Sequence, residues 1–67
     1  MSKKESLLSG RTALITGASR GIGLAIAEAY ARNGANLILS ATKEASLEEA
    51  KHSLSKYDVE ISYFAVD

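Results

Sequence analysis

Residues 12–23 read TALITGASRGIG, and this stretch decides the fold. Residues 12–16 form a short apolar, β-branched run, and the residues from Gly21 onward follow a helical period. The turn between them carries Gly17, Gly21 and Gly23. The first amides of a helix have no intrahelical acceptor and lie at the positive end of its dipole, so this order of strand, turn and helix predicts a phosphate-binding turn.

The three glycines have different expected tasks. Gly17 can adopt backbone angles that other residues avoid, while Gly21 and Gly23 carry no side chain to hold a ligand away from the main chain. Gly23 is also expected to let helix and strand pack tightly. The spacing G-x-x-x-G-x-G differs from the general dinucleotide pattern G-x-G-x-x-G. No lysine follows the glycines, which excludes a nucleoside triphosphatase loop.

Composition narrows the class of protein. With 67 residues, the chain has room for one small domain at most. Eight basic residues balance eight acidic ones, so nucleic acid and acidic partners gain no support. The absence of cysteine excludes disulfides and thiolate sites and suits the cytoplasm. Residues 1–9 are expected to be a flexible tail, too weakly apolar for a secretory signal, and no run is long enough to span a membrane.

Further elements follow the turn. A helix is expected over about residues 21–33, with Gly34 as its C-terminal cap. Its apolar face is expected to carry Ile22, Ala25, Ile26 and Ala29. A second strand includes residues 37–39, apolar without alternation, as in a sheet covered on both faces. Ser46 and Glu49 form an S-x-x-E capping box that predicts a second helix over about residues 47–57, and residues 59–66 predict a third strand. The second helix is expected to pack through Leu47, Ala50, Leu54 and Tyr57.

The predicted fold class is α/β, a Rossmann-type βαβαβ half of a doubly wound parallel sheet with strand order 3-2-1. Right-handed crossovers place both helices on one sheet face. If each strand left two or three aliphatic side chains bare on the other face, the patch would reach the order of several hundred Å², more than a soluble monomer usually exposes. Residues 10–67 are therefore expected to be the N-terminal NADP-binding half of a Rossmann domain, and the chain a fragment.

TGASRGIG, preceded by TALI and followed by LAIAEAYARNGANLIL, resembles the N-terminal segment of classical short-chain dehydrogenases/reductases, from about Gly10 to Asp67. The stretch ANLILSATKE most resembles 3-oxoacyl-acyl-carrier-protein reductases. The resemblance implies the cofactor-binding segment of a cytoplasmic, homo-oligomeric oxidoreductase that transfers hydride to or from a carbonyl or alcohol. The implied substrate is a small molecule or an acyl-carrier-bound carbonyl, with no nucleic acid or membrane partner.

The resemblance also implies a cofactor site. The turn holds the diphosphate, Thr42 lies near the adenosine phosphate, and Asp67 matches an aspartate beside the adenine ring. The acidic position that selects NAD falls at Ala41, while Arg20 and Lys43 supply positive charge, so NADP is favoured. A shift in the loop would instead bring Glu44 toward the ribose. The expected cofactor-binding residues are Gly17, Ala18, Ser19, Arg20, Gly21, Ile22, Gly23, Thr42, Lys43 and Asp67.

Catalytic residues are not expected in this chain. The family's hydride transfer uses a tyrosine with a lysine four positions on, plus a serine and an asparagine. The positions four residues after the three tyrosines are Gly34, Ile61 and Asp67. A tyrosine without a nearby cation is a poor acid at neutral pH, so the chain alone is predicted to be inactive. Two alternatives stay open: a non-catalytic, truncated nucleotide-binding fragment, and an NAD-linked alcohol dehydrogenase of the same family. No metal site is expected.

Overall fold

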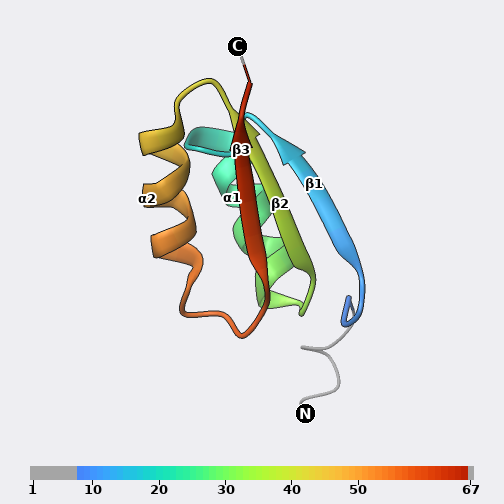
Figure 1. The fold of residues 1–67 in the computed structure, drawn as a ribbon. Helices are drawn as coiled ribbons and strands as arrows, with labels where there is room; N and C mark the ends of the chain where they lie inside the picture. The colour runs from blue at the N-terminus through green and yellow to red at the C-terminus, as the bar shows by residue number, and fades with distance from the viewer. Residues whose placement is uncertain (1–7, 67) are drawn as a thin grey trace.

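The computed structural model describes residues 8–66. The chain forms three strands and two helices in alternation (Figure 1): β1 (Thr12–Thr16), α1 (Gly21–Arg32), β2 (Asn36–Ala41), α2 (Glu44–Leu54) and β3 (Ile61–Ala65). The strands are parallel and lie in the order β1-β2-β3, so the predicted fold class and strand order are confirmed. Neither described helix has the length and hydropathy needed to cross a membrane.

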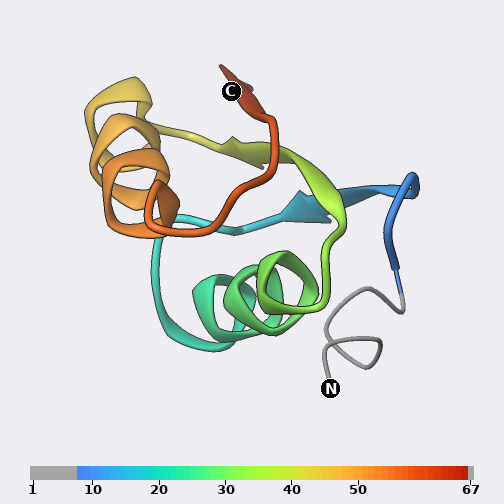
Figure 2. The ribbon, with the colours of Figure 1, turned by 90° about the horizontal axis from the view of Figure 1, so that it is seen from below.

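Both helices cover the same face of the sheet, as Figure 2 shows from below. The register places Ile15 opposite Leu39 and Leu39 opposite Tyr63, so one row of side chains crosses all three strands toward the helices. Burial of these apolar surfaces is the main force that holds such a small unit together. The buried core comprises Ile15, Ala18, Ala27, Ala31, Leu37, Leu39, Leu47, Ala50 and Leu54.

The predicted packing face of α1 is wrong. Ala27 and Ala31 are buried against the sheet, whereas Ile22 is 80% and Ile26 is 43% exposed. α1 is apolar nearly all round, so its period does not select a face. Small side chains let the helix approach the strands closely, and the bulkier isoleucines are left outside. Gly34 follows with φ of 95°, which confirms the predicted C-terminal cap.

The predicted capping box of α2 is also wrong. The helix begins at Glu44 after Lys43 and has no side-chain cap, so Ser46 belongs to its first turn. The backbone at Lys43 is extended, and helix can start there because the chain leaves β2 within two residues. The packing face is confirmed for Leu47, Ala50 and Leu54, but the helix ends at Leu54 and the third strand is shorter than predicted.

The open face of the sheet is less apolar than predicted. β1 presents Leu14 and β2 presents Ile38 there, and β3 adds Phe64, with Val66 just beyond it. The prediction of two or three aliphatic side chains per strand is therefore wrong. Thr12, Thr16, Asn36, Ser40 and Ser62 occupy the other positions of these registers. Leu14 at 61% and Phe64 at 47% exposed still make an apolar patch.

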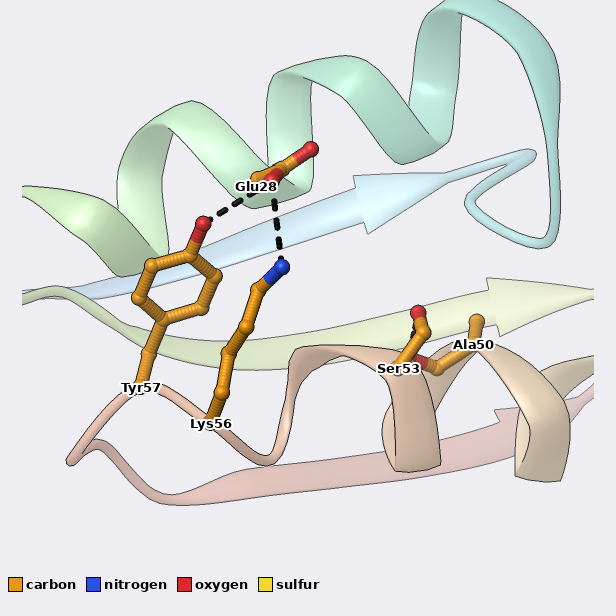
Figure 3. Close-up of polar contacts among 5 residues, drawn as sticks. All are labelled: Glu28, Ala50, Ser53, Lys56 and Tyr57. Atoms are coloured by element: carbon orange, nitrogen blue, oxygen red, sulfur yellow. Dashed lines mark hydrogen bonds and ion pairs between the residues drawn. The ribbon is translucent and has the colours of Figure 1, made fainter.

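Polar contacts join the two helical regions to each other and to neighbouring segments. Tyr57, after α2, donates its hydroxyl hydrogen to Glu28 Oε2 on α1 at 2.8 Å, with Lys56 Nζ 3.9 Å from the same oxygen (Figure 3). The hydroxyl of Tyr63 donates to Glu48 Oε2 at 3.1 Å. Leu8, placed by sequence in the tail, donates its N–H to the Asn33 carbonyl at 2.8 Å. Residues 1–7 of that tail lie outside the described residues.

Candidate functional site

The glycine turn lies at the carboxyl end of the sheet, where β1 leads into α1 (Figure 1). Gly17 and Gly21 both have φ of 64°, a left-handed conformation that costs other residues about 1–2 kcal/mol. The glycines at these positions are thus needed for the path of the backbone. A Cβ built on either would meet open space, so a ligand can come close to the main chain there.

Gly23 is restricted by space and not by backbone conformation. A Cβ at this position would collide with the carbonyl oxygen of Gly17 and approach its carbonyl carbon to 2.8 Å and the Cα of Ala18 to 3.2 Å. The first turn of α1 therefore packs directly on the backbone of the preceding turn. This agrees with the expectation of tight packing and places the contact at the turn.

The N-terminus of α1 has no side-chain cap. Arg20 is the N-cap in an extended conformation, and its side chain forms no capping hydrogen bond. The first turn holds no acidic residue. The turn is anchored to β2, because Ala18 is fully buried and donates its N–H to the Ser40 carbonyl at 3.2 Å. The amides at the start of α1 are therefore suited to an anion.

A pocket of about 700 Å³ opens beside this turn, on the uncovered face of the sheet. The turn contributes Gly17, Ser19 and Arg20, the end of β2 contributes Ser40 and Ala41, and Thr42 follows directly. Its apolar wall consists of Leu14, Phe64 and Val66, with Thr16 beside the turn. A concave site with an apolar wall and a few polar groups at one end is typical of cofactor sites.

A smaller pocket of about 170 Å³ adjoins the large one, since Ser19, Arg20 and Thr42 line both. The remaining lining residues are Lys43 and Ser46. Two cationic side chains and three hydroxyl groups thus surround this space, and no carboxylate lines it among the described residues. Its charge favours a small anion.

The structure brings together five of the predicted cofactor residues, and Gly17, Ser19, Arg20, Thr42 and Lys43 line the two pockets. Gly21 and Gly23 shape the turn, Ala18 anchors it, and the Ile22 side chain is 80% exposed. Asp67 lies outside the described residues.

Sequence reasoning missed Leu14, Thr16, Ser40, Phe64, Val66 and Ser46 as lining residues. The alternation of each strand, aligned through the parallel register, is the signal that would have found the first four. Ser46 was hidden by its assignment to a capping box.

Tyr30, Tyr57 and Tyr63 line neither of these two pockets. The hydrogen bond that Tyr57 donates to Glu28, together with burial, raises the pKa of Tyr57 above its ordinary value of 10.0. Burial and the hydrogen bond to Glu48 likewise raise the pKa of Tyr63. A general acid at neutral pH needs a shift in the opposite direction. Neither phenol is therefore suited to proton transfer at the pockets.

The chain is similar in sequence to a known protein family. The family model described as short chain dehydrogenase matches residues 11–67. D-beta-hydroxybutyrate dehydrogenase of Cupriavidus necator is 38% identical over 61 residues, 91% of this chain and 24% of the relative. L-rhamnose 1-dehydrogenase (NADP(+)) of Thermoplasma acidophilum is 44% identical over 59 residues, 87% of this chain and 23% of the relative.

Among solved structures, L-sorbose reductase from Gluconobacter frateurii, complexed with NADPH and L-sorbose, superposes with a TM-score of 0.87. It is 47% identical, and the match covers 94% of this chain and 24% of the reductase. The chain thus spans about a quarter of the length of the proteins it matches. Because the family model covers nearly the whole chain and the glycine turn has the geometry described above, the chain belongs to the short-chain dehydrogenase family.

Proposed function

We propose that this chain is the N-terminal, cofactor-binding segment of an NADP(H)-dependent oxidoreductase that transfers hydride to or from a carbonyl or alcohol substrate. The observation that carries the proposal is the pair of adjoining pockets at the carboxyl end of the sheet, where the glycine turn meets the end of β2. In open α/β sheets, ligands bind outside the carboxyl ends of the strands. The nicotinamide cofactor would donate the hydride when a carbonyl is reduced and accept it when an alcohol is oxidised.

The diphosphate is assigned to the glycine turn. The open space beside Gly17 and Gly21 admits a ligand to the backbone, and the uncapped start of α1 favours negative charge. Ser19 lines both pockets and offers a hydroxyl donor. The amides of Gly21, Ile22 and Gly23 are the proposed main-chain donors.

The choice of NADP over NAD rests on charge. Ala41, at the end of β2, offers no carboxylate to a ribose 2′-hydroxyl, and Arg20 and Lys43 line the small pocket. A guanidinium binds phosphate as a planar fork, and an ammonium adds a point charge. Glu44, the residue that would favour NAD, lines neither pocket. The NADP-named and NADPH-bound relatives support the same choice.

The remaining parts of the proposal concern the complete protein. We place the catalytic tyrosine and lysine, the substrate pocket and the oligomer contacts in sequence beyond these residues, and we expect this segment to be inactive by itself. The acyl-carrier-bound substrate, the homo-oligomer and the cytoplasmic location remain expectations from the resemblance. A non-catalytic nucleotide-binding protein is the alternative, which the presence or absence of a downstream tyrosine with a lysine four residues on would decide.

The test is binding of NADPH and NADH by the complete protein and its Arg20→Ala variant, measured by fluorescence titration. Loss of the guanidinium should weaken NADPH binding about 10-fold to 100-fold and NADH binding much less, because only NADPH carries the extra phosphate. Arg32→Ala is the matched control, since Arg32 lies in the last turn of the same helix, away from both pockets. Equal losses for the two cofactors would refute the role of Arg20.

A further inference from the structure

Two stretches that are far apart in sequence, residues 19–20 and 42–46, enclose the small polar pocket. Ser19 and Arg20 come from the turn before α1, Thr42 and Lys43 from the loop after β2, and Ser46 from the first turn of α2. The pocket is one quarter or less of the size of its neighbour, at about 170 Å³ against about 700 Å³. It suits a single compact group attached to a ligand that occupies the large pocket.

The chemistry of the lining selects an anion with several acceptor oxygens. Two cations face this space, and the hydroxyls of Ser19, Thr42 and Ser46 are hydrogen-bond donors. A phosphate monoester has the charge and the number of acceptors that such a set can satisfy. The N-terminus of α2 adds the positive end of a helix dipole, which the carboxylate of Glu44 in the same turn partly offsets.

Ser46 differs from Ser53 on the same helix and from Ser55 just after it. Ser53 donates its hydroxyl hydrogen to the Ala50 carbonyl at 3.0 Å, as Figure 3 shows, and Ser55, just after the helix, donates to the His52 carbonyl at 2.7 Å. Ser46 is half-buried, and its hydroxyl makes no hydrogen bond within residues 8–66. Because α2 begins at Glu44, Ser46 does not cap the helix, and it lines the small pocket.

We propose that Ser46 is a specificity-determining residue, whose hydroxyl donates a hydrogen bond to the ribose 2′-phosphate of NADPH. The proposal rests on the proposed function, because it needs the dinucleotide in the large pocket. It extends the anion site from the two loops to α2, so the first turn of that helix helps to distinguish the two cofactors.

The experiment measures Kd values of NADPH, NADH and 2′,5′-ADP for the complete protein and for Ser46→Ala. The expected result is a roughly tenfold increase in Kd for NADPH and 2′,5′-ADP, the value of one hydrogen bond to a charged group, with the Kd of NADH unchanged. Ser46→Asp should weaken NADPH binding further, because a carboxylate in the pocket repels the phosphate. Ser53→Ala, the same change on the same helix, should alter none of the three.

The outcomes separate the two proposals. A loss confined to the ligands with a 2′-phosphate supports the role of Ser46. Equal losses for NADPH and NADH, or no loss at all while Arg20→Ala still selects against NADPH, would overturn this inference and leave the proposed function in place. Failure of the unaltered protein to bind either dinucleotide would overturn both. Retained NADH binding shows that each variant is folded.

Discussion

The contact between α1 and the turn before it makes Gly23→Ala a direct test of the site's architecture. The added methyl would overlap the Gly17 carbonyl group, which is backbone and cannot rotate away as the end of a side chain does. Overpacking of this kind costs about 1–3 kcal/mol, and alanine returns about 1 kcal/mol through its higher helix propensity. Because the clash is with backbone, we take the upper end and expect a net loss of about 2 kcal/mol.

The assay is urea and thermal unfolding of the complete protein, followed by circular dichroism. For a domain of about 150–250 residues, a loss of about 2 kcal/mol lowers Tm by about 4–8 °C. NADPH binding should weaken in parallel, since the shifted turn carries the proposed diphosphate donors.

Gly21 supplies the comparison, because its constraint is the backbone angle and not space. Asparagine tolerates the left-handed region, so Gly21→Asn should be milder than Gly21→Ala, whereas at Gly23 asparagine should be no better than alanine. Unchanged unfolding free energy in Gly23→Ala would refute the close contact and the reasoning built on it.

Two further predictions concern the layers of the fold. Glu28→Gln should lower the pKa of Tyr57 toward 10, measured by NMR titration of the ring, because the carboxylate stabilises the protonated phenol. Since the folded-state pKa lies above the unfolded value, the stability from this contact is fully present below about pH 10 and is lost as pH rises through the folded pKa; an unshifted titration would contradict it. The isolated 67-residue chain should self-associate through the open sheet face, and the double change Leu14→Ser and Phe64→Ser should shift its sedimentation toward monomer. Identical sedimentation of the two chains would argue against that face.

The sequence alone determined the order of elements, the parallel sheet and the position of the glycine turn. These features depend on local signals: β-branched runs, helical spacing, and glycine at positions whose φ proved to be positive. The meeting of Arg20, Thr42 and Lys43 was likewise predictable, because each follows a strand and parallel strands bring their carboxyl ends to one edge.

Only the tertiary structure decided which surfaces meet. α1 is apolar on most sides, so the choice of Ala27 and Ala31 over the isoleucines came from how closely a helix can approach the strands. Ser46 is not a capping residue because α2 already begins at Glu44, soon after the end of β2. A capping motif in the sequence does not show where the preceding strand ends. The complete lining of the pockets could not be predicted for the same reason, although several of its residues could. The pockets form where the glycine turn, the end of β2 and the start of α2 come together. The spacing of these three segments is set by the packing of the whole helical layer and not by any one segment.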